Sequence, residues 1–362
     1  MNLRTLSQFR FQIARQLNLW HCCFPTCTIQ KSDCAADRIR SFSREISAAQ
    51  VSDGRVLKPI LILMATRNGG RFISDQLESI ARQSHADWQL WVSDDSSTDA
   101  TLEIVGTFAA RRPQGQIKVL RGPGIGATEN FRSLLRRADL AGRCLAFCDQ
   151  DDVWDADHLA RGLQALTDVP NPLAVYGCRM RVCDAALQEL HLSPRPARPL
   201  GFRNALVQNM LSGNTMLMTP AAAQLLQEAE AEAGSIPIHD WWAYQLVTGA
   251  GGTAILDEQP GLLYRQHGAN VIGLKRGIRT VPGRLARHLR GKHREWALQN
   301  SAALAASSAR LTPENRERLR AFTEALSAPL PGKLASLRRS GVYYQSPQAR
   351  AAFWLSVAIG GF

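Results

Sequence analysis

Short apolar runs alternate with helical patterns over residues 56 to about 270, and this alternation limits the possible folds more than any other feature. Strands that alternate with helices form a doubly wound, mostly parallel sheet, which binds ligands at the carboxyl ends of its strands. We therefore expect an α/β fold with functional residues at strand ends. The expected elements are a strand at 60–64, a helix at 72–84, a strand at 88–93, a helix at 100–111, a strand at 117–120, a helix at 129–138 and a strand at 145–148.

The net charge of +12 is concentrated in the two ends of the chain. Residues 271–362 hold 16 Lys and Arg against 4 acids, and residues 1–55 hold 8 against 4. We expect a poorly ordered N-terminal extension over 1–55, an α/β domain over 56–275 and a basic helical C-terminal region over 276–362, in which Pro313 starts a helix. Basic and apolar side chains together favour an anionic membrane surface as partner of this last region, and a solvated helical face is the alternative. No nucleic-acid motif is present, so nucleic acid is not an expected partner.

Composition, with 45% hydrophobic and 20% charged residues, predicts a soluble, globular protein, and the lack of a secretory signal predicts that it is cytoplasmic. No stretch approaches the roughly 20 apolar residues of a spanning helix, and the N-terminus lacks the apolar run of a secretory signal. The eight cysteines are therefore expected as thiols. Five residues near the N-terminus could be imagined as a zinc site, but their spacing matches no paired zinc pattern, which favours a poorly ordered extension: His21, Cys22, Cys23, Cys27 and Cys34.

Polar residues follow the first two expected strands. The first turn reads ATRNGGR, and its amides, with the side chains of Thr66 and Asn68, can hold part of a nucleotide. It has neither a phosphate-binding loop nor a dinucleotide fingerprint, which disfavours ATP hydrolysis and nicotinamide chemistry. After the second strand, Asp94 and Asp95 can accept hydrogen bonds from a base or from ribose hydroxyls, while residues 97–99 can cap the next helix.

The highest density of negative charge is FCDQDDVWD, directly after the last expected strand. Asp149 and Asp151, two positions apart in extended chain, would point to the same side. Carboxylate oxygens of this kind hold Mg²⁺ or Mn²⁺ and leave coordination sites for phosphate oxygens. A metal there would neutralise charge on a diphosphate leaving group. The alternative is an acidic turn that caps a helix starting near Asp155.

Five sequence segments in order carry a family resemblance. ILILMATRNGG and WVSDDSSTDAT resemble the nucleotide-binding half of the family 2 glycosyltransferases, and CDQDDVWD resembles their Asp-x-Asp element. IHDWWAYQLVTGAGG and LDEQPGLLYRQHGANVIG resemble the second half of the rhamnosyltransferase-like members. The resemblance covers about residues 58–275 and implies a glycosyltransferase catalytic domain over 56–275. It also implies a GT-A-like fold, a doubly wound mixed, mostly parallel sheet flanked by helices, with the basic helical region following.

The resemblance also implies roles for single residues in the nucleotide and metal sites. Thr66, Asp94 and Asp95 match positions that contact the nucleotide. Asp149 and Asp151 match the Asp-x-Asp pair, with Asp151 as the direct metal ligand. Ser96 stands where the family has a glycine, which leaves the backbone of that turn less defined.

Three positions in the second half match the family's catalytic machinery. Asp240 in HDWW falls at the catalytic base, which takes the proton from an acceptor hydroxyl. His267 in YRQHG matches a position that completes the metal shell or binds the diphosphate, and Arg265 can pair with phosphate. His239 is expected to support Asp240 rather than to act as the base.

Structural alternatives exist for each of these motifs. Asp240 could instead be the N-cap of the helix that follows, and His267 could be a histidine satisfied by ordinary hydrogen bonds. Residues 212–215, SGNT, could line the donor sugar or form a turn. Three aromatic side chains could form a sugar wall or belong to the core: Trp241, Trp242 and Tyr244.

The function implied by the resemblance is an inverting, Mg²⁺- or Mn²⁺-dependent transfer of a sugar from a nucleotide donor. The best candidate donor is dTDP-L-rhamnose, and the acceptor is a hydroxyl of a lipid-linked polysaccharide precursor at the inner membrane face, where the protein would be peripheral. A metal-dependent phosphoryl-transfer enzyme or nuclease would instead bind nucleic acid with steep salt dependence. A noncatalytic nucleotide-sugar-binding protein would bind without turnover. HDWW and YRQHG count against both alternatives.

Overall fold

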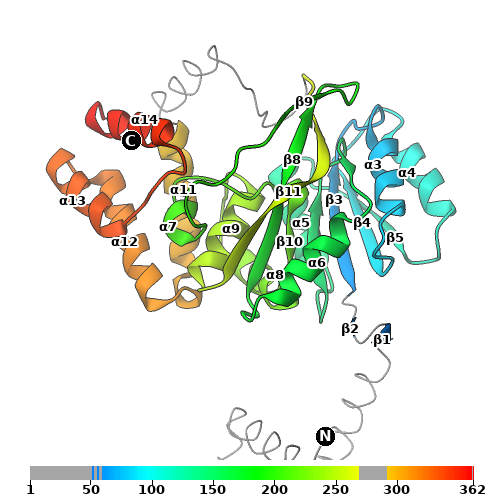
Figure 1. Ribbon diagram of the computed structural model, residues 1–362, viewed down its shortest axis with the longest axis horizontal. Coiled ribbons are helices and arrows are strands. Elements are labelled where there is room, and N and C mark those ends of the chain that lie inside the picture. Colours follow the sequence, from blue (N-terminus) through cyan, green and yellow to red (C-terminus); the bar gives the residue numbers. More distant parts are fainter. Residues whose placement is uncertain (1–50, 53–54, 57–58, 269–291, 361) are drawn as a thin grey trace, which may run out of the picture. The chain divides into compact units, whose positions relative to one another are not determined.

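The structure is a computed structural model in which two compact units, residues 1–57 and 58–362, are distinguished. Strands β1 (Val51–Ser52) and β2 (Arg55–Val56) pair antiparallel in the first unit. Most of the expected N-terminal extension, including the His and Cys cluster at 21–34, lies outside the described residues. The structure describes residues 51–52, 55–56, 59–268, 292–360 and 362 (Figure 1).

The second unit is built on one mixed sheet with the strand order β5-β4-β3-β6-β10-β8-β11-β7 and with β9 paired to β8. The first four strands in this order are parallel, β10 is antiparallel to both neighbours, and β11 is parallel to β8. The expected mixed, mostly parallel sheet is therefore confirmed. Its strands are β3 (Ile60–Thr66), β4 (Trp88–Asp94), β5 (Ile117–Arg121), β6 (Cys144–Cys148), β7 (Val153–Trp154), β8 (Ala174–Cys183), β9 (Glu189–Leu192), β10 (Leu217–Met218) and β11 (Thr253–Arg265).

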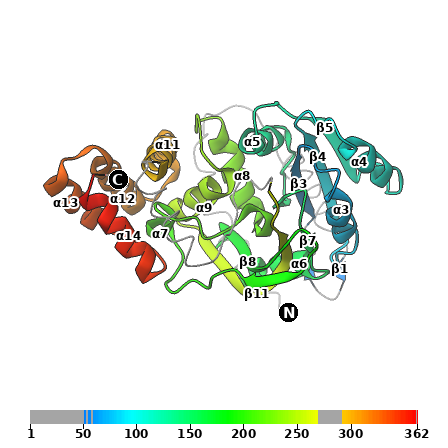
Figure 2. The same ribbon diagram turned by 90° about the horizontal axis from the view of Figure 1, so that it is seen from above.

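Helices cover both faces of the sheet (Figure 2). The central strand β3 reads ILILMAT and is almost wholly buried, as a parallel strand covered on two sides must be. Its side chains alternate: Ile60 and Ile62 pack with the first helical layer, and Leu61 and Leu63 pack with the second. The first layer is α3 (Ile73–Ala81), α4 (Thr101–Ala110) and α6 (His158–Asp168), and the second is α5 (Ala127–Arg137), α8 (Pro220–Glu230) and α9 (His239–Gly249).

All seven expected elements are present, and their ends shift by at most three residues. Because β3 lies between β4 and β6, the carboxyl ends of these three strands are neighbours. The register pairs Thr66 with Asp94 and Met64 with Cys148. The three polar segments identified in the sequence therefore meet at one edge of the sheet, at the point where the strand order reverses.

The described part of the C-terminal region is helical, as expected, and residues 269–291 lie outside the described residues. Pro313 is the first residue of its helix, and the Thr312 hydroxyl accepts a hydrogen bond from the Asn315 amide at 3.3 Å. The Thr312 amide donates to the Gly249 carbonyl at the end of α9, so these helices share the core of the second unit. No helix in the described ranges is long and apolar enough to span a membrane. The helices are α11 (Lys292–Ala306), α12 (Pro313–Ser327), α13 (Leu330–Ser340) and α14 (Pro347–Ala358), with a 3-10 turn η2 (Ser308–Arg310).

Candidate active site

Hydrogen bonds join the turn that follows β3 to the turn that follows β4. The Thr66 hydroxyl donates to Asp94 Oδ1 at 3.0 Å. The Asn68 amide donates to the Ser97 hydroxyl at 2.8 Å, and Asn68 Oδ1 accepts from the Thr98 amide at 2.8 Å. The two turns thus form one preorganised surface at the sheet edge.

The aspartate pair after β4 is buried and already holds the backbone around it. Asp94 accepts hydrogen bonds from the Ser97 amide at 2.9 Å and from the Ser97 hydroxyl at 2.5 Å. Asp95 accepts from the amides of Gly124 at 2.5 Å and Gly126 at 3.0 Å, in the loop between β5 and α5. Both carboxylates therefore shape the loops that would surround a nucleotide, and their direct contact with a nucleotide stays a prediction.

The backbone conformation at Ser96 explains why the family has a glycine at this position. Ser96 has φ = 65°, in the left-handed region that glycine adopts without penalty. A left-handed conformation costs an L-residue roughly 1–2 kcal/mol. The departure from the family pattern therefore leaves the shape of the turn intact and makes it less stable.

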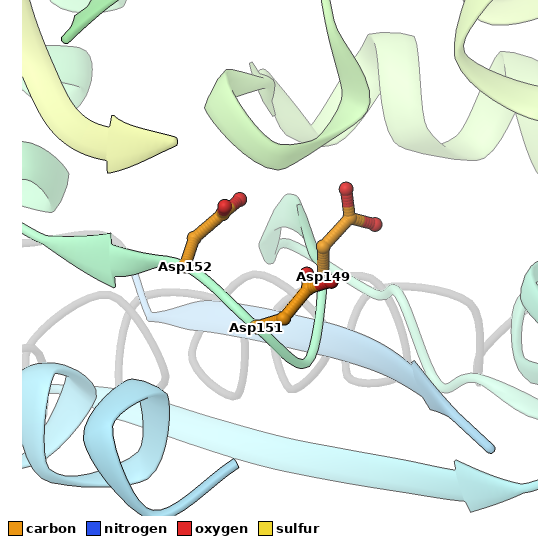
Figure 3. Close-up of side chains that lie close together, drawn as sticks. All are labelled: Asp149, Asp151 and Asp152. Atoms are coloured by element: carbon orange, nitrogen blue, oxygen red, sulfur yellow. The ribbon is translucent and has the colours of Figure 1, made fainter. Parts of the chain in front are cut away.

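After β6 the chain bends, and three carboxylates project from one short loop (Figure 3). The expectation that Asp149 and Asp151 lie in extended chain is wrong, because residues 149–152 turn back before β7 begins. One oxygen from each of Asp149, Asp151 and Asp152 lies within 4.8 Å of the others. The bend gathers three carboxylates where an extended strand would have gathered two.

Two of these carboxylates have fixed partners. His267 Nε2 lies 2.7 Å from Asp151 Oδ2, so the structure brings the predicted metal ligands together. Asp152 accepts hydrogen bonds from Asn214 Nδ2 at 2.5 Å and from the Arg265 amide at 3.1 Å. No hydrogen bond from any described residue reaches the carboxylate of Asp149.

The cluster carries more negative charge than a buried site can hold. Burial, together with the charges of Asp151 and Asp240, raises the pKa of Asp149 to about 8. Burial and the charges of Asp151 and Asp149 raise the pKa of Asp152 well above its ordinary value. Carboxylates and an imidazole in this arrangement fit a divalent cation, whose charge would replace the retained protons.

The alternative that this acidic segment caps a helix near Asp155 is wrong. Helix α6 begins three residues later at His158, and the Asp157 side chain at its N-cap makes no capping hydrogen bond. The Asp155 carboxylate instead forms an ion pair with Arg181 on β8. Helix capping therefore does not account for the three aspartates.

Arg265, the last residue of β11, makes hydrogen bonds to the loop at residues 149–152, which we call the acidic loop. Its Nε donates to the Asp151 carbonyl at 2.9 Å, Nη1 donates to the Ala185 carbonyl at 2.8 Å, and Nη2 donates to Asp75 Oδ2 at 2.7 Å. The guanidinium lies over the Phe72 ring, and the residue is only 3% exposed. The predicted pairing of Arg265 with phosphate therefore competes with a set of internal bonds.

Asp240 lies in the first turn of α9 and is buried. The N-cap of this helix is Ile238, so the alternative that Asp240 caps the helix is wrong. Its carboxylate accepts from Asn209 Nδ2 at 3.1 Å and from the Gly213 amide at 2.7 Å. Burial raises the pKa of Asp240 to about 6. The charge of Asp240 also contributes to the raised pKa of Asp149.

The SGNT segment links the acidic cluster to Asp240. It forms a 3-10 turn, η1 (Gly213–Thr215), in which Gly213 binds Asp240 and Asn214 binds Asp152. The indole of Trp154 donates to the Asn214 carbonyl at 3.1 Å and fixes the turn. A Cβ at Gly213 would lie 3.2 Å from the Asp240 Cβ, which is tighter than an ordinary contact and favours glycine here. The turn alternative is thus observed, and contact with a sugar stays a prediction.

The aromatic residues around Asp240 belong to the core, so the sugar-wall interpretation is wrong for them. Trp241, Trp242 and Tyr244 are all buried, and the Trp241 indole donates to the Ala205 carbonyl at 2.7 Å. His239 stacks on Phe131 with ring centroids 3.9 Å apart, and burial lowers its pKa to about 3. A neutral, packed His239 fits the supporting role expected for it.

Sequence reasoning missed several supporting side chains. Gln150 bridges to the turn after β3, accepting from the Arg67 amide at 2.9 Å and donating to its carbonyl at 3.1 Å. Its place between the aspartates of CDQDD was a usable signal. Asn209 and Asn214 orient Asp240 and Asp152, and no local pattern marked Asn209.

Comparison with known proteins gives the class to which this fold and site belong. Residues 61–232 match the sequence model of Glycosyl transferase family 2. Over 224 residues the chain is 29% identical to the dTDP-rhamnosyl transferase RfbG of Shigella flexneri, covering 58% of this chain and 73% of that protein. Over 101 residues it is 36% identical to the UDP-Glc:alpha-D-GlcNAc-diphosphoundecaprenol beta-1,3-glucosyltransferase WfgD of Escherichia coli, covering 28% of this chain and 38% of that protein. The crystal structure of S. aureus TarS 1–349 with UDP-GlcNAc has a TM-score of 0.47 and 15% identity, covering 79% of this chain and 93% of that one.

The chain is a glycosyltransferase that uses a nucleotide sugar. Its residues 61–232 match glycosyl transferase family 2, and the chain resembles the rhamnosyltransferase members of that family, as its motifs indicated. The mixed sheet flanked by helices is the GT-A-like architecture expected for such an enzyme.

Proposed function

We propose that this enzyme transfers L-rhamnose from dTDP-L-rhamnose, with inversion, to a hydroxyl of a lipid-linked precursor of a cell-surface polysaccharide. The observation that carries the proposal is the buried, doubly hydrogen-bonded Asp240 beside the Asp149 cluster. Similarity to a dTDP-rhamnosyl transferase supports the donor. Similarity to WfgD, whose name specifies a diphosphoundecaprenol-linked acceptor, supports a lipid-linked acceptor.

Asp240 is the proposed general base. The acceptor oxygen attacks the anomeric carbon while Asp240 takes its proton, and the bond from that carbon to the diphosphate breaks with its electron pair on the diphosphate. The Gly213 amide and Asn209 orient the carboxylate. A pKa of about 6 makes Asp240 a stronger base than an ordinary aspartate while leaving it mostly ionised at neutral pH.

The proposed metal ligands are Asp149 and Asp151, with Asp152 and His267 completing the donor set. Mg²⁺ or Mn²⁺ held there would neutralise the charge that develops on the departing diphosphate. Arg265 and Asn214 keep these carboxylates in place through their hydrogen bonds to Asp151 and Asp152.

The nucleotide is proposed to bind on the joined turns after β3 and β4, against Thr66, Asn68, Asp94 and Asp95. Arg265 is a further proposed residue of this site, where its guanidinium would pair with a phosphate of the nucleotide. We also propose that residues 56–275 form the catalytic domain. Residues 276–362 would then associate with the inner membrane face.

The test is release of nucleoside diphosphate from dTDP-rhamnose, UDP-glucose, UDP-N-acetylglucosamine and GDP-mannose, with membrane extract as acceptor. Each donor is assayed with Mn²⁺, with Mg²⁺ and with chelator. Asp151→Ala and Asp240→Asn are expected to abolish a metal-dependent activity confined to dTDP-rhamnose. Asp157→Asn is the matched control, because its side chain is 51% exposed on α6.

Three outcomes would contradict the proposal in different ways. Activity with a different donor only would show that the proposed sugar is wrong and that the enzyme class is right. Donor binding without turnover would indicate a noncatalytic binding protein. Activity that persists in Asp240→Asn would remove Asp240 as the base.

A further inference from the structure

Helix α14 exposes a continuous apolar stripe. Its inner face is anchored, because Phe353 packs edge-on against Phe362 with ring centroids 4.8 Å apart and Val357 is buried. The outer face carries side chains at helical spacing i, i+3, i+4, i+7 and i+8, and all five are exposed and apolar: Ala351, Trp354, Leu355, Ala358 and Ile359. We call these five residues the α14 stripe.

The α14 stripe is unusual among the described residues. Trp354, Leu355 and Ile359 are 37%, 50% and 58% exposed. The described surface has ten large hydrophobic side chains that are exposed, and these three fall within six residues of one helix. A helix that is apolar all round needs a partner on each side, and the core covers only one side of α14.

We propose that the α14 stripe inserts into the headgroup region of an anionic lipid bilayer. Charge favours this occupant, since residues 292–362 carry 10 Lys and Arg against 4 Asp and Glu. Arg350, at the start of the stripe, is exposed and has no carboxylate partner among the described residues. Cations beside an apolar helical face are typical of helices that lie in the membrane interface.

The length and composition of α14 fit an interfacial position. At 12 residues it is too short to cross a bilayer, so it would lie in the plane of the headgroups. Trp354 suits this depth, because tryptophan concentrates at the boundary between headgroups and acyl chains.

The location of α14 connects the stripe to the active site. In Figure 1, α14 lies on the same upper side as β9, which pairs with the carboxyl-terminal end of β8. Because β8 runs in the same direction as β3 and β6, the acidic cluster also lies toward that side. A helix seated on the bilayer would hold the site near a membrane-embedded acceptor, and this step alone rests on the proposed function.

The test is flotation of the full chain with vesicles of phosphatidylcholine containing about 30% phosphatidylglycerol, with pure phosphatidylcholine as comparison. The double variant Leu355→Gln with Ile359→Gln is expected to partition roughly thirtyfold more weakly. Arg350→Gln is expected to weaken partitioning about fivefold at low salt. Leu102→Gln is the matched control, because Leu102 is a 45% exposed leucine on α4 and partitioning should be unchanged.

Specific results would overturn the proposal. Wild-type protein that does not float with anionic vesicles, or a double variant that floats as well as wild type, would refute it. Concentration-dependent dimerisation in sedimentation velocity, lost in the double variant without vesicle binding, would make the stripe an interface between copies. Melting temperature and donor hydrolysis without vesicles show that the variants fold. If wild type floats but hydrolyses no donor, the proposed function fails and the bilayer proposal survives.

Discussion

Replacing Arg265 with methionine is expected to destabilise the loop at residues 149–152. This variant tests whether Arg265 is a clamp, meaning a side chain that holds this loop by hydrogen bonds, or a ligand for phosphate. The guanidinium makes two hydrogen bonds to the carbonyls of Asp151 and Ala185 and an ion pair with Asp75. Methionine keeps the apolar contact with Phe72 but removes all three polar interactions. A residue that only bound phosphate could be removed with little effect on folding.

The magnitude follows from these contacts. A hydrogen bond from a charged donor contributes about 1.5–3 kcal/mol, so the two carbonyl bonds together contribute about 3–6 kcal/mol. The ion pair adds at most about 1 kcal/mol, because the Asp75 side chain is 54% exposed and screened by solvent. At roughly 2 °C per kcal/mol for a unit of this size, Arg265→Met should melt about 6–14 °C below wild type.

The assay compares thermal unfolding in chelator and in Mn²⁺ for Arg265→Met, Arg265→Lys and Asp75→Asn. A clamp predicts a large loss for methionine and an intermediate loss for lysine, which keeps the charge without the planar fork. Asp75→Asn should shift the melting temperature by at most about 2 °C. Stabilisation by Mn²⁺ should also shrink in Arg265→Met, because the ligands of the acidic loop are displaced. A melting temperature unchanged to about 1 °C, combined with tenfold weaker nucleotide binding in calorimetry, would refute the clamp and establish a phosphate ligand.

Other variants test the base, the metal cluster and the strained turn. Asp240→Asn should lower kcat roughly 10²–10⁴-fold with donor affinity unchanged. The wild-type rate should fall as the pH drops below about 6, because the base must be ionised. A rate that stays constant down to pH 5 would contradict this role. The pKa of Asp149 is raised to about 8, so the folded state retains a proton that the unfolded state loses, and the free energy of unfolding should fall between about pH 4 and pH 8. Asp149→Asn should therefore raise the melting temperature in chelator at pH 8 and abolish the response to Mn²⁺, and a lower melting temperature would refute this reasoning. Ser96→Gly should stabilise the fold by up to about 1 kcal/mol in urea titrations, since relief of the left-handed strain exceeds the entropy added to the unfolded chain; destabilisation would show that the serine side chain is needed.

The elements around the site were predictable because their signal is local. A run such as ILILMAT has one reasonable conformation when helices flank it on both sides, and the strand appeared where expected. The sheet edge followed from the same pattern, because parallel strands share a carboxyl edge. The placement of Thr66, Asp94 and Asp149 together was thus contained in the order of the motifs.

The roles of single side chains were less predictable because they depend on contacts between distant parts of the chain. Arg265 lies 190 residues from Asp75, and Asn214 lies 62 residues from Asp152. No local pattern shows that an arginine in YRQHG is committed to internal partners. The sequence also did not indicate which face of α14 is exposed. Apolar residues lie on more than one face of this helix, so their pattern does not show which face the core covers.

Two carboxylates in this site have raised pKa values for different reasons, and the difference separates their tasks. Burial alone raises the pKa of Asp240, and hydrogen bonds moderate it. The pKa of Asp149 is raised by burial and also by the charges of Asp151 and Asp240. A cation at the cluster would offset those charges and ionise Asp149, but it would leave the burial of Asp240 unchanged. In the proposed roles, burial therefore governs the carboxylate that would take the proton, whereas burial and neighbouring charge together govern the carboxylate that would bind the metal.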